Sequence, residues 1–200
     1  MYVKVEPRPY RMVARAAAAA ARGDRILDAA IAIFWERPTV EISLDEVARR
    51  GGVSVQTVIR RFGDKEGLFA AAVEREAART RDQRDAAIGA GLTEAVRVLV
   101  DHYEELGDRV LRMLAEEDRI PALREIADRG RAFHRDWCAA VFADALGNRR
   151  GGARARLHAQ LVAICDVYTW KLLRRDAGLS RRQGELALVE MLRPLTEEGW

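Results

Sequence analysis

Residues 51–69 of the sequence read GGVSVQTVIRRFGDKEGLF and bring together side chains that form paired hydrogen bonds. The amide of Gln56 can bind adenine through two hydrogen bonds, and the guanidinium of Arg60 or Arg61 can bind guanine in the same way. Thr57 and the two arginines can also hold backbone phosphates. The chemistry that this stretch predicts is recognition of DNA.

The residues around this stretch are suited to hold it as a short exposed helix. Ser43 and Glu46 have the three-residue spacing of a capping box, which predicts the start of a preceding helix. Gly51 and Gly52 can take the positive φ that ends that helix and turns the chain, and Ser54 can cap the next helix. Two short helices joined by a tight turn can place the second one in the major groove of DNA.

On the second helix, Val53, Val58 and Phe62 turn inward, which leaves the other side chains mainly exposed. We therefore expect the DNA-contacting residues to be Ser43, Ser54, Val55, Gln56, Thr57, Ile59, Arg60, Arg61 and Lys65. The alternative interpretation is a solvated helix in a purely structural domain.

The composition predicts an all-α protein. Hydrophobic residues make up 49% of the 200 residues, which is ample for a buried core, and only 5 residues are proline. We expect about nine helices in three parts: a basic flexible arm (residues 1–22), a three-helix helix-turn-helix domain (23–70) and a C-terminal helical bundle (71–200).

Apolar residues at helical spacing define the helices of that bundle. After a helix from Asp64 to about Thr80, we expect helices over residues 92–106, 108–118, 121–147, 153–177 and 180–195.

The net charge of +3 is unevenly distributed. The first 80 residues contain 14 Lys and Arg against 11 Asp and Glu, whereas the remaining 120 contain 20 of each kind. This asymmetry favours a polyanionic partner for the N-terminal part. The basic arm could add contacts to DNA phosphates or a minor groove, or it could be a frayed tail.

The segment Arg25 to Phe69 resembles the DNA-binding domain of the tetracycline-repressor (TetR) family. The resemblance lies in Ile26, Leu27, Ala29, Ala30, Phe34, Val47, Ala48, the GVS of residues 52–54, Thr57, Phe62 and the KEGLF of residues 65–69. It implies a ligand-responsive transcriptional regulator, expected to be a repressor, that binds a near-palindromic operator as a homodimer. A small, mostly apolar effector would release it.

Ile59 departs from the family pattern. Family members commonly have a tyrosine there, whose hydroxyl reaches a phosphate, so Arg60 or Arg61 would have to supply that contact in this sequence.

The DVYTWKLLRRDAGLS of residues 166–180 also resembles the terminal part of some family members, which implies a homodimer through the last two helices. Aromatic and polar residues of the bundle could line an effector site, although each aromatic could instead be ordinary core. The expected effector contacts are His102, Tyr103, Met113, Phe133, His134, Trp137, Cys138, Phe142, Tyr168 and Trp170.

His134 and Cys138 lie one helical turn apart and could face the same ligand or metal. Because the sequence shows no third donor nearby, we expect a packed or hydrogen-bonded pair and neither a metal site nor a cofactor. A metal-responsive regulator stays an alternative.

The sequence has no phosphate-binding glycine loop, no HExxH and no nucleophile motif, so we do not expect an enzyme. An architectural DNA-binding protein without an effector is the other alternative. Two distant cysteines and the absence of a membrane-spanning stretch predict a cytoplasmic protein.

Overall fold

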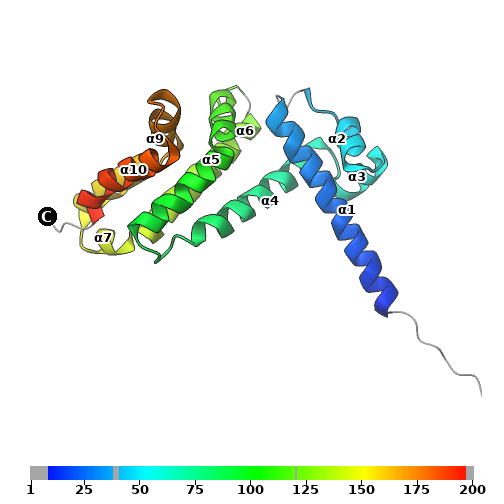
Figure 1. Ribbon diagram of the computed structural model, residues 1–200. Helices are drawn as coiled ribbons and strands as arrows, with labels where there is room; N and C mark the ends of the chain where they lie inside the picture. Colours follow the sequence, from blue (N-terminus) through cyan, green and yellow to red (C-terminus); the bar gives the residue numbers. More distant parts are fainter. Residues whose placement is uncertain (1–8, 38–40, 120, 197–200) are drawn as a thin grey trace, which may run out of the picture. The chain divides into compact units, whose positions relative to one another are not determined.

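The computed structural model describes residues 9–37, 41–119 and 121–196, which are helical apart from short connections (Figure 1). The α-helices are α1 (Pro9–Glu36), α2 (Leu44–Gly51), α3 (Val55–Phe62), α4 (Lys65–Asp85), α5 (Leu92–Glu116), α6 (Pro121–Val141), α7 (Ala143–Gly147), α8 (Gly151–Ile164), α9 (Val167–Lys171) and α10 (Arg181–Thr196). A π-helical turn (Leu172–Asp176) follows α9 directly. No strand occurs in the described ranges, which confirms the all-α prediction, with ten α-helices where we expected about nine.

The chain divides into two compact units, Met1–Glu76 and Ala77–Trp200. The division falls inside α4, whereas we placed the boundary just after residue 70. Each unit has its own hydrophobic core. In the first unit, the four helices bury one another through Ile26, Ala30 and Ile33 of α1, Val47 and Ala48 of α2, Val58 of α3 and Leu68 of α4.

The first helix is longer than we expected. It begins at Pro9, so residues 9–22 of the expected arm are helical. The run of alanines from Ala16 to Ala21 explains this, because alanine has the highest intrinsic helix propensity, and proline is tolerated in a first turn. Residues 1–8 of the expected arm lie outside the described residues.

In the second unit, α5 packs against α6, α9 and α10, and α8 packs against α6 and α10. Figure 1 shows α5 and α10 running alongside each other. Within the described ranges, none of the helices combines the length and the apolar character that crossing a bilayer requires.

Helix α5 is continuous through Gly107, where we expected one helix to end and another to begin. A Cβ atom at Gly107 would lie 2.5 Å from Cζ3 of Trp170, so the indole rests directly on the helix backbone. The glycine is therefore needed for close packing and does not break the helix.

The predicted helix over residues 121–147 is instead two helices. The chain leaves helical geometry at Phe142, which has φ −105° and ψ 30°, and α7 follows. The Phe142 side chain is only 6% exposed, so burial of this ring in the core accompanies the break.

The predicted helix over residues 153–177 is also broken, at Cys165 and Asp166. The Asp166 carboxylate accepts a hydrogen bond from the backbone N–H of Tyr168 at 2.9 Å and so caps α9. The Tyr103 hydroxyl donates to the Cys165 carbonyl at 3.0 Å, which satisfies a buried acceptor at the break.

Candidate nucleic-acid interface and effector site

Helices α2 and α3 form the predicted helix-turn-helix. Ser43 Oγ accepts the backbone N–H of Glu46 at 3.2 Å, and Ser54 Oγ accepts that of Thr57 at 3.3 Å. Gly52 ends α2 with φ 64°, the left-handed conformation that glycine adopts without steric cost. Each of these signals acts within a few residues, and each was predicted from the sequence.

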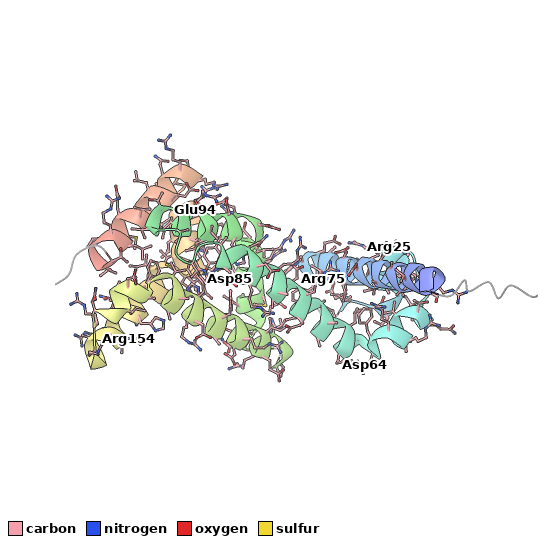
Figure 2. The ribbon with its side chains drawn as sticks, turned by 90° about the horizontal axis from the view of Figure 1, so that it is seen from below. Arg25, Asp64, Arg75, Asp85, Glu94 and Arg154 are labelled. Carbon is pink, nitrogen blue, oxygen red and sulfur yellow. The ribbon has the colours of Figure 1, made fainter. Side chains whose placement is uncertain are left out.

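Ion pairs link this motif to the helices around it. Arg50 of α2 donates two hydrogen bonds to Glu36 of α1, at 2.7 and 2.5 Å, and these bonds lower the pKa of the Glu36 carboxyl. Arg75 of α4, which Figure 2 labels, forms an ion pair with Asp28 of α1. Because such pairs are exposed to solvent, they add little to stability, and their main effect is to fix orientation.

The outward face of α3 carries the predicted DNA-contacting residues. Val58 is fully buried, whereas Gln56 and Arg60 are exposed and Ile59 is 47% exposed. Val55 and Thr57 are half-buried. The side chains on this face are short or medium in length, apart from the arginine near its end, so the helix can approach a base edge closely.

The two adjacent arginines differ in their surroundings. A Cβ atom at Gly23 of α1 would overlap the guanidinium of Arg61, so this side chain is packed on the α1 backbone. Both side chains are exposed, but Arg60 has no such packing contact and no ion pair in the part of the chain that the structure describes. Arg60 is therefore the more available of the two for a phosphate or a base.

The corner between α3 and α4 depends on glycine. Asp64 accepts the backbone N–H of Gly67 at 2.8 Å and caps α4. A Cβ atom at Gly67 would overlap the carbonyl oxygen of Phe62, so only glycine lets α4 begin so close to the end of α3. This geometry places Lys65 in the first turn of α4, close in sequence to the end of α3.

The second candidate site, in the other unit, is centred on Arg84 of α4, which we did not predict. Its side chain is 2% exposed. The guanidinium carbon lies 3.9 Å from the ring centroid of Trp137 and 5.5 Å from that of Phe133. The Trp137 indole N–H donates to the Arg84 carbonyl oxygen at 2.8 Å.

His134 completes this cluster through both ring nitrogens. Its Nδ1 lies 3.1 Å from a terminal nitrogen of Arg84, and because a guanidinium can only donate, Nδ1 must be the acceptor. Nε2 therefore carries the proton and donates to the Val162 carbonyl at 3.1 Å. The Cys138 sulfur lies 3.8 Å from the same Nε2.

The cysteines and their neighbours do not form a metal site. The Cys165 thiol hydrogen-bonds the Cys138 sulfur, which lowers the pKa of Cys138 and raises that of Cys165. Across the described ranges, no three His, Cys, Asp or Glu side chains are grouped as a metal would require.

His102 and Tyr103 lie on the side of α5 that faces this core. His102 is 8% exposed, and burial, followed by the charges of Arg84 and His134, lowers its pKa to about 3. Its Nδ1 is buried and has no hydrogen-bond partner. Burial also raises the pKa of Tyr103.

The other expected effector contacts differ in how deeply their side chains are buried. Phe142 and Trp170 are buried in the same core, and the Trp170 N–H donates to Glu104 at 3.0 Å. Met113 is half-buried on α5, and Tyr168 is 54% exposed on α9, so Tyr168 does not face the interior as we expected.

Comparison with known proteins identifies the first unit. The family model described as bacterial regulatory proteins, tetR family, matches residues 26–72, the segment that builds the helix-turn-helix and its supporting helices. Residues 26–72 are a DNA-binding domain of the TetR family. An uncharacterized helix-turn-helix-type transcriptional regulator of Mycobacterium tuberculosis is 38% identical to this chain over 77 residues. That alignment spans 38% of each chain.

Solved structures share the fold over most of the chain. A candidate transcriptional regulator from Pseudomonas aeruginosa PAO1 superposes with a TM-score of 0.65 at 18% identity, covering 88% of this chain and 90% of that one. The SmeT protein in its complex with triclosan gives a TM-score of 0.59 at 21% identity, covering 86% of this chain and 90% of that one. The matched DNA-binding domain and the fold are those found in transcriptional regulators.

The sequence did contain a signal for Arg84. Val73, Ala77, Thr80, Arg84 and Ala87 follow one another at alternating spacings of four and three, which is the register of one helix face. All five are buried or half-buried, so an arginine in the inward register was the clue to this site.

Proposed function

We propose that this protein is a ligand-responsive transcriptional repressor of the TetR family. It binds a near-palindromic operator as a homodimer and leaves it when a small, mostly apolar effector binds the second unit. The observation that carries this proposal is the exposed polar face of α3, held by caps and ion pairs that fix its direction. Since its partner is operator DNA, we place its action in the cytoplasm.

The apolar residues exposed on the last helices support a homodimer. Tyr168 and Leu172 are 54% and 59% exposed, and Leu186 and Met191 of α10 are 57% and 43% exposed. Large apolar side chains in such number on neighbouring segments are typical of an interface. We assign it to a second copy, because a two-fold axis would present two recognition helices to successive major grooves, about 34 to 36 Å apart.

The buried aromatic residues around Arg84 support an effector in the second unit, and the fold relative SmeT binds triclosan. Helix α4 contributes Leu68 to the first core and Arg84 to the second cluster. An effector that contacts Arg84 or Trp137 therefore acts on a helix that also belongs to the DNA-binding unit. Regulation requires that the effector bind the DNA-free and DNA-bound states with different affinities.

Operator binding by arginine variants tests the DNA-binding part. An operator selected from random duplex DNA with the wild-type protein would be titrated with Arg60→Ala at several salt concentrations. Each lost phosphate contact should reduce the slope of log affinity against log salt by about 0.9, or about 1.8 for a dimer. Arg129→Ala, which removes an exposed arginine from α6, is the matched control.

Arg61→Ala should weaken binding less than Arg60→Ala, because Arg61 is packed against α1. Gln56→Ala should relax the base preference at one operator position in each half-site, since a bidentate contact is worth about 1–3 kcal/mol of discrimination. Unchanged affinity and salt slope in an Arg60→Ala, Arg61→Ala double variant would show that α3 is not the recognition helix.

A further inference from the structure

Arg84 is a buried cation with no carboxylate beside it. The side chain is 2% exposed, and in the described ranges no Asp or Glu forms an ion pair with it. Its contacts are the rings of Trp137 and Phe133 and one hydrogen bond to His134. A buried charge that is not paired is costly, so such arginines are rarely kept without a partner.

Two hydrogen-bonding atoms in this region also lack partners. The Nε–H of Arg84 is buried and donates to no acceptor, and the buried Nδ1 of His102 has no partner either. Because buried polar atoms are almost always satisfied in folded proteins, unsatisfied ones require an explanation. Both side chains are more than nine-tenths buried, and the two are close enough for the charge of Arg84 to affect the titration of His102.

The thiol groups form no hydrogen bond with Arg84, although a hydrogen bond from Cys165, a hydrogen bond from His134 and the charges of His134 and Arg84 lower the pKa of Cys138 to about 5. Cys138 hydrogen-bonds Cys165 and lies near His134 Nε2, and no hydrogen bond joins either sulfur to Arg84. The arginine therefore has free donor capacity: its Nε–H and the terminal N–H groups that His134 does not use.

We propose that the effector is an apolar organic acid and that Arg84 binds its carboxylate. This assignment rests on the proposed function and adds the chemical class of the effector. The Nε–H and a terminal N–H of a guanidinium match the two oxygens of a carboxylate side by side. One arginine compensates one negative charge, whereas a phosphate dianion would leave a net charge in a core lined by Phe133 and Trp137.

His102 offers a second buried nitrogen that could hydrogen-bond the carboxylate. Because its imidazole is neutral at physiological pH, it carries one ring proton, and its unpartnered Nδ1 can donate that proton to a carboxylate oxygen. An effector acid would thus satisfy both of these buried nitrogens.

Matched acids and amides test the assignment. Octanoate, decanoate, cinnamate and naphthoate would each be compared with the primary amide of the same carbon skeleton by thermal shift and by titration calorimetry. We expect at least one acid to bind the full-length protein about tenfold or more tightly than its amide. If every acid binds no better than its amide, the proposal is wrong.

Substitutions at Arg84 then locate the carboxylate. Arg84→Met should abolish the preference for the acid, and Arg84→Lys should retain it with weaker binding, because lysine keeps the charge and loses the paired donors. Arg129→Met on the exposed face of α6 is the control and should bind as the wild type does. Equal binding of the acid to the wild type and Arg84→Met would overturn the assignment.

The stability of the ligand-free variants gives an independent readout. If Arg84 is kept for binding, Arg84→Met should fold and should unfold within a few degrees of the wild type, because removal of a buried charge offsets the lost hydrogen bond to His134 Nδ1. An Arg84→Met protein that does not fold would instead assign Arg84 to the structural core and would overturn the proposal.

Operator titrations separate this inference from the proposed function. A neutral apolar compound that lowers operator affinity equally in the wild type and Arg84→Lys would support regulation by an effector. It would contradict the proposal that the effector binds through a carboxylate. An acid that binds through Arg84 and leaves operator affinity unchanged would support the site and contradict its coupling to DNA.

Discussion

The guanidinium of Arg84 stacks on the indole ring of Trp137 at 3.9 Å, and the Trp137 N–H donates to the carbonyl oxygen of the same arginine at 2.8 Å. One tryptophan of α6 therefore holds both the side chain and the backbone near the end of α4. This double contact fixes the direction of the arginine and ties α4 to the core of the second unit.

Replacement of Trp137 by Phe should loosen this contact. The Arg84 carbonyl would keep the N–H of Ala87, at 3.1 Å, so the expected loss in the free energy of unfolding is about 0.5–1.5 kcal/mol. Trp137→Ala should cost about 3–5 kcal/mol, because it also leaves a cavity. Urea unfolding would measure both values, and a Trp137→Phe protein as stable as the wild type would show that the hydrogen bond adds nothing.

Two glycines of the second unit should respond to alanine in opposite ways. At Gly107 the added Cβ would lie 2.5 Å from Trp170, so Gly107→Ala should destabilise the protein by about 1–3 kcal/mol. At Gly130 of α6 the Cβ would meet no atom within 4 Å, so Gly130→Ala should be neutral or stabilising by up to about 1 kcal/mol. Thermal unfolding of the pair checks this, and equal effects would contradict the packing of Trp170 on α5.

His102 should make the protein sensitive to mild acid. Burial, with the charges of Arg84 and His134, lowers its pKa to about 3, against 6.5 for the free side chain. Between these values the unfolded chain binds a proton that the folded protein does not, so stability falls as the pH is lowered. The contribution of this residue is at most about 1.4 kcal/mol per pH unit.

The His102→Gln variant, which does not titrate, should therefore lose less stability than the wild type between pH 7 and pH 5. Urea unfolding at both pH values gives the comparison. His158, whose Nε2 bonds the Arg135 carbonyl at 2.9 Å on the surface, offers the control substitution His158→Gln. Identical pH dependence in His102→Gln and the wild type would show that folding does not lower the pKa of His102.

The apolar residues of the last helices should hold the dimer together. Leu186→Glu places a carboxylate on the exposed face of α10, and a two-fold axis would bring two such charges into one interface. We expect a monomer by light scattering at concentrations where the wild type is a dimer. Ile88→Glu, at a site that is 47% exposed between α4 and α5, should leave the dimer intact. A Leu186→Glu dimer would place the interface elsewhere.

Removal of the first 22 residues tests the N-terminal half of α1. Arg15 and Arg22 are exposed, and the core of the first unit begins at Ile26, so the shortened protein should stay folded. We expect weaker operator binding at low salt, a smaller salt slope and the same preferred operator, because phosphate contacts carry no sequence information. Equal affinity of the two proteins at low salt would show that this segment does not contact DNA.

The sequence by itself determined the helix-turn-helix. Ser43, Gly52 and Ser54 act on backbone groups within three or four residues, so the caps and the turn between α2 and α3 could be predicted without knowledge of any distant contact. The assignment of Val58 as buried and Arg60 as exposed follows from the same local periodicity. The match to the TetR family model also lies in this part of the chain, over residues 26–72.

The tertiary structure alone decided how the second unit is built. Gly107 continues α5 because Trp170, far along the chain, covers it. The chain breaks at Cys165, where the Tyr103 hydroxyl donates a hydrogen bond to the Cys165 carbonyl. Arg84 belongs to a candidate site because His134 and Trp137, about fifty positions later in the chain, contact it in the folded protein. Local spacing can place a residue on a helix face, but whether a charge there meets solvent, a carboxylate or two aromatic rings depends on which helices pack against that face.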